Sequence, residues 1–202
     1  MIIVGALVAI GIGKMTFGGL GCNPFNPAIV GRCFLLVSFP AAMTSWPVAG
    51  QQMAYTDAVT GATPLSLMKT AIKTGDVSVL QGLPDTVDML LGNVANGYGA
   101  GTIGEVCALA LIAGLIWMLW RRVITWHIPV TILATVFVLS GALHAANPVY
   151  AHPMAVVLSG GLMLGAIFMA TDYVTSPMTH RGQVIYAVGI GVLTVVIRNW
   201  GS

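Results

Sequence analysis

Charged side chains are scarce in this sequence. Asp, Glu, Lys and Arg make up 7% of its 202 residues, whereas ordinary soluble domains contain about 25%. Hydrophobic residues make up 57%. So few charges cannot cover a water-facing surface, and most of the exterior must therefore face lipid or other apolar protein. The composition predicts an integral membrane protein of the all-α class.

Basic clusters and paired cysteines are missing as well. A net charge of +2 without a basic run excludes nucleic-acid binding as a main role. The cysteines Cys22, Cys33 and Cys107 have no C-x-x-C spacing and are odd in number. This pattern argues against a disulfide framework and against a zinc or iron–sulfur site built from this chain alone. We expect small buried thiols instead, with ligation of an iron–sulfur cluster at an interface as the alternative.

A basic leader is also absent. Met1 runs directly into apolar residues, without the basic stretch or the small-residue cleavage site of a secretory signal. Nothing polar caps either end, and the chain stops at Ser202 just after an apolar stretch. We therefore expect this chain to be a piece of a longer protein.

Several segments approach the roughly 20 apolar residues that a bilayer-spanning helix needs. They are Ile2–Phe17, Ala28–Trp46, Thr102–Trp120, Ile124–Leu143, Met154–Thr171 and Val184–Ile197. The first is short and glycine-rich, so we expect part of its helix to be missing. The sequence thus predicts about six transmembrane helices in three parts. These are residues 1–47 with two helices and a broken Asn-Pro elbow, residues 48–101 as one long outer loop, and residues 102–202 with the remaining helices.

Basic residues in the short connections predict the orientation. Arg121 and Arg122 lie between the third and fourth segments, and Arg181 lies between the fifth and sixth. Lys14 and Arg32 flank the first connection, which falls on the same side. Because cytoplasmic loops are enriched in Lys and Arg, this side is expected to be the cytoplasm. The long loop, which contains most of the acids, then lies outside.

The first motif is an elbow that interrupts two apolar segments, Asn23-Pro24-Phe25-Asn26-Pro27. Irregular backbone at membrane depth is tolerated where it packs in protein or lines a cavity, and broken helices form ligand and ion sites in transporters. The alternative is a tight cytoplasmic turn, with Pro27 at the first position of the next helix. Composition alone leaves both interpretations open.

The second motif is Thr60-Gly61-Ala62-Thr63-Pro64 in the long loop. It is small and rich in hydroxyls, and it is typical of a helix start with a capping threonine and proline in the first turn. A helix over residues 65–73 would follow. A threonine hydroxyl is a poor nucleophile unless a base or a metal activates it.

Two acids stand at the ends of apolar segments, Glu105 and Asp172. An acid at the lip of a span is a candidate for ion handling, since carboxylates suit hard cations and protons. Both could instead lie in water at an interface or a polar helix exit. The histidines have no metal-ligand spacing, so the sequence predicts no metal site and no catalytic residue within this chain.

Together these motifs resemble the NqrB/RnfD family, and most closely its RnfD members, over nearly the whole chain. Members of that family are longer at both ends, with about ten spans, so this chain would correspond to a central and C-terminal part. The matching motifs are Gly-Leu-Gly-Cys-Asn-Pro-Phe-Asn-Pro-Ala at 19–28, Ser-Phe-Pro at 38–40, Thr-Gly-Ala-Thr-Pro-Leu at 60–65, Gly-Glu at 104–105, Asn-Pro-Val-Tyr-Ala-His-Pro at 147–153 and the segment 160–177.

The resemblance implies a covalent FMN, joined through its phosphate to Thr63 by a separate flavin transferase on the outer side. Thr60, Gly61 and Ala62 complete that motif. Since the transferase makes the phosphoester, Thr63 need not activate itself. We further expect the elbow at Asn23 and Asn26 to line a cavity for a second flavin or an ion.

The family also implies a role in a larger assembly. Such a chain would relay electrons between ferredoxin and NAD in an Rnf-type complex, coupled to Na⁺ or H⁺ movement across a bacterial or archaeal cell membrane. Its partners would be other membrane subunits, a second FMN-bearing subunit, and iron–sulfur and NADH-binding subunits. A different class remains open, a broken-helix channel or carrier for a small solute without a redox role. A third alternative is a scaffold that has lost activity.

Overall fold

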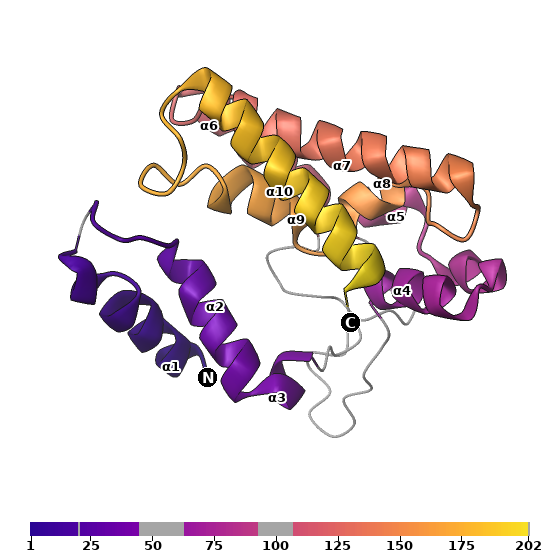
Figure 1. Cartoon of the computed structure of the whole chain (residues 1–202), viewed down its shortest axis with the longest axis horizontal. Coiled ribbons are helices and arrows are strands. Elements are labelled where there is room, and N and C mark those ends of the chain that lie inside the picture. The colour runs from indigo at the N-terminus through magenta and orange to yellow at the C-terminus, as the bar shows by residue number, and fades with distance from the viewer. Residues whose placement is uncertain (20, 45–62, 93–106, 202) are drawn as a thin grey trace.

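The regular structure of the described chain is entirely helical. The computed structural model describes residues 1–19, 21–44, 63–92 and 107–201, and no strand occurs in these ranges. The expectation of an all-α fold is therefore confirmed for this part of the chain. The elements (Figure 1) are α1 Ile2–Leu7, η1 Val8–Ile12, η2 Met15–Phe17, α2 Pro27–Ser38, α3 Pro40–Thr44, α4 Pro64–Thr74, η3 Val77–Gly82, α5 Thr86–Leu91, α6 Ala108–Trp120, α7 His127–Ala146, α8 Pro153–Leu158, α9 Leu162–Leu164, η5 Gly165–Met169 and α10 His180–Trp200.

Helices α7 and α10 are the longest elements and pack against each other along most of their length (Figure 1). With 20 and 21 residues, each is about 30 Å long, which is enough to cross the hydrocarbon core of a bilayer. Buried residues recur at every fourth position. Helix α7 buries Ile128, Ile132 and Val136, and α10 buries Gly191 and Val195. This spacing places one face of each helix in the shared core.

The remaining faces of these two helices are apolar and exposed. Val138 is 65% exposed on α7, and Ile185 is 74% and Leu193 61% exposed on α10. Apolar surface of this extent indicates cover by lipid or by other apolar protein. Three further apolar helical stretches are shorter than a full span, Ile2–Phe17, Pro27–Ser38 and Ala108–Trp120.

The fourth and sixth predicted spans are confirmed as helices with shifted ends. Helix α7 runs from His127 to Ala146 and α10 from His180 to Trp200. The earlier start of α10 has a local cause, because the Thr179 hydroxyl accepts a hydrogen bond from the backbone N–H of Gly182 at 3.2 Å. Hydropathy locates the apolar stretch but does not detect the polar residues that cap it.

The second predicted span is interrupted within its described part. Helix α2 ends at Ser38, and α3 begins at Pro40. Phe39 lies between them with φ −134° and ψ 57°, which is a non-helical backbone conformation. Proline has no N–H and restricts the residue before it, so the α2 ladder cannot continue through this point.

The fifth predicted span is interrupted and does not form one continuous helix. Its residues form α8, a break and the short elements α9 and η5. Ser159 has a β-region backbone at the end of α8, and Gly160 follows with φ +63°. That left-handed conformation costs glycine little and other residues more. Average hydropathy does not reveal the break, because Ser159, Gly160 and Gly161 lie within an otherwise apolar segment.

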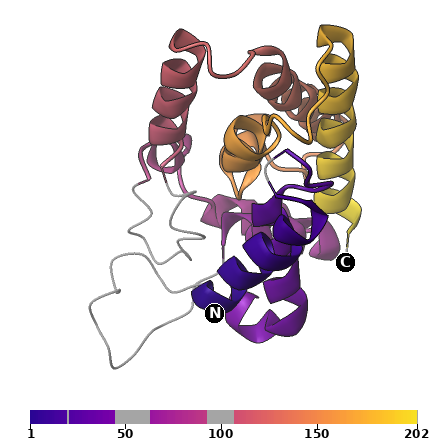
Figure 2. The same ribbon diagram turned by 90° about the vertical axis from the view of Figure 1, so that its left-hand side faces the viewer.

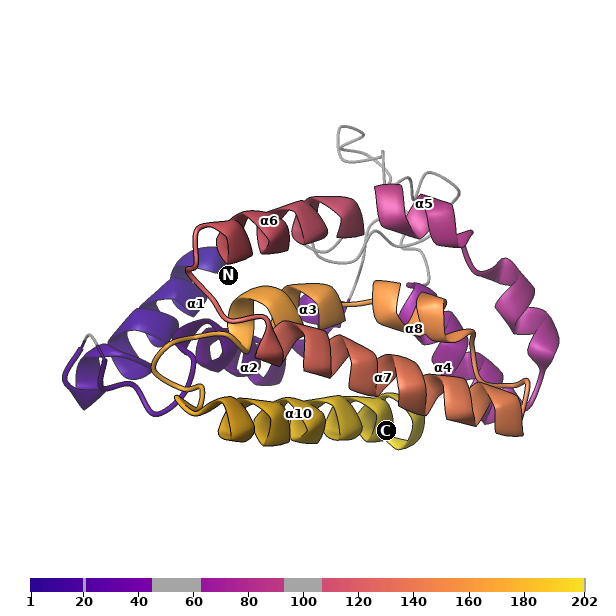
Figure 3. The ribbon, with the colours of Figure 1, turned by 90° about the horizontal axis from the view of Figure 1, so that it is seen from above.

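The described part of the predicted outer loop contains α4, η3 and α5, so it is helical in part. These elements lie at one end of the molecule, whereas the connections between α6 and α7 and between η5 and α10 lie at the other (Figure 3). Helices α1 to α3 form a group beside the α6–α10 bundle (Figure 2). The assignment of the basic connections to the cytoplasm stays a prediction.

The cysteines differ from the expectation of buried thiols. All three are free, Cys22 and Cys33 are exposed, and Cys107 is half-buried. Cys33 lies on α2, whose side chains are largely exposed within this chain. Apolar character therefore did not predict burial here, because a surface that faces lipid or a partner accepts the same residues as a core.

Candidate functional site

Thr63 stands at the start of α4 and caps it. Its side-chain oxygen accepts a hydrogen bond from the backbone N–H of Ser66 at 3.3 Å, and the Ser66 hydroxyl donates to the Thr63 carbonyl at 2.7 Å. Pro64 occupies the first helical position, where its missing N–H costs nothing. The predicted capping role and helix are therefore confirmed. The residue is half-buried at the positive end of an 11-residue helix.

Helix α4 rests on the break that follows α8. Met68 is 5% exposed, and its sulfur accepts a hydrogen bond from the Ser159 hydroxyl at 3.9 Å. A Cβ built on Gly160 would lie 3.5 Å from Leu65 Cδ2. The first turns of the helix that Thr63 caps are thus packed directly against the interrupted span.

The elbow is held by its two asparagines. Asn23 is 5% exposed, and its amide donates to the Phe25 carbonyl at 2.9 Å. Asn26 caps α2, because its side-chain oxygen accepts from the Ala28 N–H at 3.0 Å. The Asn26 amide also donates to the Met169 carbonyl at 3.4 Å, which connects the elbow to the end of η5. The turn with Pro27 at the first helical position is confirmed, and the same turn borders a cavity.

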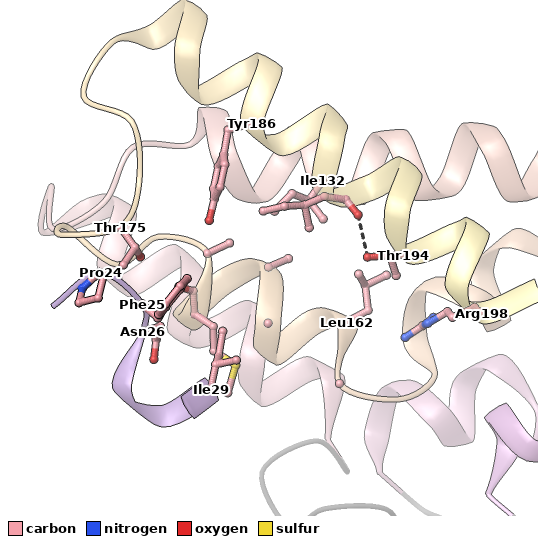
Figure 4. Close-up of a pocket in the computed structure, with 16 residues that line it drawn as sticks. Pro24, Phe25, Asn26, Ile29, Ile132, Leu162, Thr175, Tyr186, Thr194 and Arg198 are labelled. Carbon is pink, nitrogen blue, oxygen red and sulfur yellow. Dashed lines mark hydrogen bonds between the residues drawn. The ribbon is translucent and has the colours of Figure 1, made fainter. Parts of the chain in front are cut away.

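A cavity of about 590 Å³ lies between the elbow, the interrupted span and α10 (Figure 4). Its volume falls within the roughly 300–1,000 Å³ of small-molecule sites. Most of its lining is apolar, including Phe25 and Ile132. The polar lining residues are Asn26, Thr175, Tyr186, Thr194 and Arg198. A cavity of this kind suits a mostly apolar ring system with a few polar positions.

Arg198 is the functional candidate that sequence reasoning missed. It is half-buried near the end of α10, and its two terminal nitrogens donate to the carbonyls of Val156 at 2.7 Å and Ser159 at 3.0 Å. These carbonyls belong to the end of α8, where backbone acceptors lack helical partners. An arginine at the end of an apolar span is itself a signal of function, and that signal could have identified this residue.

Asp172 stands in the turn after η5. Its carboxylate accepts a hydrogen bond from the Thr175 hydroxyl at 3.2 Å, and its carbonyl accepts from the Ser176 N–H at 3.0 Å. Thr175 lines the cavity, so Asp172 lies one hydrogen bond away from it. Thr60, Gly61, Ala62 and Glu105 lie outside the described residues.

Asp76, in the segment between α4 and η3, has a shifted pKa. The backbone N–H and hydroxyl of Ser78 donate hydrogen bonds to Asp76 and hold the pKa of its carboxyl below its ordinary value. Asp76 thereby caps η3. Among the described residues, no group of three or more His, Cys, Asp or Glu side chains converges to hold a metal ion.

The comparisons with known proteins agree on one family. The model of the NQR2, RnfD, RnfE family matches residues 1–202. The chain is 44% identical over 200 residues to the D subunit of the Na⁺-translocating ferredoxin:NAD⁺ oxidoreductase complex of Acetobacterium woodii, covering 99% of this chain and 57% of that relative. It is 40% identical over 209 residues to the D subunit of the proton-translocating ferredoxin:NAD⁺ oxidoreductase complex of Clostridium ljungdahlii, covering 100% of this chain and 60% of that relative.

A third relative extends the pattern. The D subunit of an ion-translocating oxidoreductase complex of Stutzerimonas stutzeri is 37% identical over 221 residues, covering 98% of this chain and 60% of that relative. The chain thus spans about 60% of the length of the curated relatives it matches. Since the family model covers the whole of it, this chain belongs to the NQR2, RnfD, RnfE family.

Proposed function

We propose that this chain is a membrane subunit of an Rnf-type complex that relays electrons between ferredoxin and NAD through a covalent FMN at Thr63, coupled to translocation of Na⁺ or H⁺. The named relatives support the activity, because they are D subunits of ferredoxin:NAD⁺ oxidoreductase complexes, one Na⁺-translocating and one proton-translocating. The activity would belong to the assembled complex and not to this chain alone.

The observation that supports attachment most directly is the position of Thr63 at the start of α4. Helix N-termini favour phosphate groups, because unpaired N–H groups and the helix dipole both attract negative charge. A phosphoester at Oγ1 would leave that oxygen free to accept from the Ser66 N–H, so the cap and the attachment are compatible. The residues present therefore fit a phosphate-linked flavin.

A bound FMN would supply reversible electron-carrier chemistry at this position. The chain itself would anchor and orient it. Met68 and Ala71, which is fully buried, hold α4 against the bundle, so that the attachment point has a fixed place relative to the spans. A fixed position would hold a flavin attached at Thr63 in one orientation relative to the spans.

The cavity is the second element of the proposal. We propose that it accepts a second flavin or borders the ion path, with Asn26 and Thr175 at one end. Asn23 would hold the elbow in shape through its bond to the Phe25 carbonyl. Asp172 and Glu105 are the proposed ion-handling acids, because a carboxylate near a membrane cavity can bind a hard cation or a proton.

The proposed membrane arrangement has about six spans in this chain and further spans elsewhere in the complex. The shorter apolar helices α2 and α6 would complete their spans with neighbouring segments. The partners would be the membrane, second FMN-bearing, iron–sulfur and NADH-binding subunits, together with the flavin transferase. The location would be a bacterial or archaeal cell membrane.

Covalent flavin can be tested directly. The chain is produced in its complex together with a flavin transferase, denatured and separated on a gel, and the gel is examined for flavin fluorescence. We expect a fluorescent band for the wild type and none for Thr63→Val. Thr63→Asp keeps a capping oxygen but cannot form the ester, so it should also be dark while α4 stays capped.

Two controls separate attachment from folding. Thr63→Ser keeps both the cap and a hydroxyl, and we expect at least part of the fluorescence to remain. Thr70→Val removes another exposed hydroxyl of α4, and its band should match the wild type. A dark wild-type band, in the presence of an active transferase and an assembled complex, would overturn the assignment to Thr63.

The cavity also favours a second candidate function, a carrier or channel for a small solute. The elbow and the interrupted span border it, and interrupted helices line solute sites in transporters. In that case Thr63 would be only a helix cap. Absence of bound flavin together with solute flux through the reconstituted complex would favour this function over the electron relay.

A further inference from the structure

An open groove lies on the surface of the α7–α10 pair, where both helices begin. It has a volume of about 450 Å³ and is lined by His127 of α7 and by His180, Arg181, Val184 and Ile185 of α10. The residues from α10 come from two successive turns and share one face of the helix. None of the described residues lines both this groove and the large cavity, so the groove is a separate feature.

Three stacked rings form one wall of the groove. The Trp126 ring stacks on the His127 ring with centroids 4.3 Å apart, and the His127 ring stacks on the His180 ring at 4.4 Å. The stack joins the start of α7 to the start of α10. Close by in the sequence, the Thr125 hydroxyl donates a hydrogen bond to Oε1 of the buried Gln183 at 3.0 Å. The two helices that form the groove are thus connected at this end.

The groove lies at a basic end of the molecule. Arg181 is exposed and forms no hydrogen bond or ion pair with any other residue that the structure describes. Arg121 and Arg122 are exposed in the connection between α6 and α7 at the same end. Of the described acids, Asp172 lies at this end, where it accepts from the Thr175 hydroxyl, and the others lie in the segment from α4 to α5 at the opposite end (Figure 3). This charge distribution favours an anionic ligand.

The position of the groove along the two long helices indicates its depth in a membrane. Helices α7 and α10 are each long and apolar enough to cross the hydrocarbon core, and both begin at this end. Trp126, next to the start of α7, is 56% exposed. Tryptophan is enriched at the boundary between headgroups and hydrocarbon. The groove is therefore expected at that boundary.

Exposed apolar side chains continue from the groove along α10. Ile185, Val188, Val192 and Val196 follow one another at spacings of three or four residues, and all are exposed. Such spacing keeps them on one face of the helix. From Arg181 to Val192 the helix axis rises about 16 Å, which is about half of the roughly 30 Å thickness of the hydrocarbon core. The length of this face therefore matches one acyl chain of a single leaflet.

We propose that the groove binds an anionic phospholipid, with its phosphate beside Arg181 and an acyl chain over Val184 and Ile185. Guanidinium groups bind phosphate oxygens through paired hydrogen bonds, and basic pockets between transmembrane helices bind acidic lipid headgroups. The apolar lining favours a lipid over a free phosphate ion, because a free ion gains nothing from Val184 and Ile185. The site goes beyond the proposed function, since it requires α7 and α10 in a membrane but requires no flavin.

The test captures whatever covers the groove. The whole complex is produced with Ile185, which is 74% exposed, replaced by a photoreactive diazirine amino acid. It is reconstituted into vesicles of phosphatidylglycerol and phosphatidylcholine and illuminated, and mass spectrometry of the α10 peptide gives the ratio of the two lipid adducts. We expect phosphatidylglycerol to be enriched about fivefold over the vesicle composition, the preference that one basic residue gives near acidic lipid. Arg181→Gln should return the ratio to that of the vesicles.

Matched variants separate the charge at Arg181 from other effects. Arg181→Lys keeps the charge and should keep most of the enrichment. Lys73→Gln removes an exposed charge from α4, at the opposite end of the molecule, and should leave the ratio at the wild-type value. Added inorganic phosphate should not reduce the enrichment. If it abolishes the enrichment, the site takes free phosphate, and the assignment to a lipid is overturned.

The remaining outcomes separate this site from the proposed function. With Arg181 intact, an adduct ratio equal to that of the vesicles would overturn the lipid site, whether or not the Arg181 variants assemble. Cross-links from α10 to another protein subunit in place of lipid would assign the groove to a subunit interface and would overturn it as well. Flavin fluorescence is measured on the same preparations, and a dark band would count against the flavin at Thr63 while leaving the lipid ratio standing.

Discussion

The α7–α10 pair and the interrupted elements around the cavity satisfy their backbone hydrogen bonds in different ways. In the long pair each helix satisfies its own backbone hydrogen bonds, so only side-chain fit is needed between them. Around the cavity the helices end within the bundle, and side chains form hydrogen bonds with the backbone groups at these helix ends. Asn26 caps α2, and Arg198 bonds the end of α8. The interrupted region therefore depends on individual polar residues, and these border the proposed sites.

The largest effect is expected in the long pair, where two backbones approach closely. A Cβ on Gly191 would lie 2.7 Å from Thr135 Cβ. Gly191→Ala should therefore destabilise the chain by about 2 kcal/mol, because overpacking forces the helices apart. The thermal unfolding midpoint of the purified complex measures this change.

A matched control exists two residues away. A Cβ on Gly189 meets no atom within 4 Å, so Gly189→Ala should leave the midpoint unchanged or raise it slightly. Equal losses of stability in the two variants would show that close packing of α7 and α10 does not limit stability.

In the interrupted region, loss of the cap at Asn26 should lower stability by less than overpacking at Gly191 does, but by a measurable amount. Asn26→Ala removes the α2 cap and the bond to the Met169 carbonyl. We expect a loss of about 1 kcal/mol, the usual cost of a lost cap. Asn26→Asp keeps an acceptor for the Ala28 N–H, so it should recover most of the midpoint. A lower midpoint for the aspartate than for the alanine would contradict the capping role.

The smallest effect concerns the Asp76 cap of η3 and its pH dependence. Because hydrogen bonds from Ser78 lower the pKa of Asp76 in the folded state, its contribution to stability is fully present above its unfolded pKa. The contribution is lost as the pH falls through the folded pKa. Asp76→Leu should therefore lower the unfolding midpoint at about pH 7 and have less effect near about pH 3. A difference from wild type that grows on acidification would contradict this sign.

Part of the fold and of the site could be predicted because it depends on local sequence. Apolar length located α7 and α10, and the Thr63-Pro64 pair located the start of α4. The elbow was located by its prolines and asparagines. Caps and proline stops involve residues within a few positions of one another, so their signals lie in a short stretch of sequence.

Apolar length alone did not predict the break after α8 or the hydrogen bonds that Arg198 makes to it. The segment around Ser159 is apolar enough to be one span. At its interruption, the Ser159 carbonyl accepts a hydrogen bond from the side chain of Arg198, 39 positions later. Such an arrangement depends on which helices lie side by side, which hydropathy does not report. The outward position of Cys33 was missed for the same reason.

The amino-acid sequence by itself determined the membrane class, the helical content, the elbow and the family, since each follows from composition or contiguous motifs. Only the tertiary structure decided that the elbow, the interrupted span and one face of α10 border one cavity, and that Arg198 of α10 both lines it and bonds the end of α8. The physical reason is that an interrupted helix needs hydrogen-bond partners, and within a membrane protein those partners come from whichever element packs beside it.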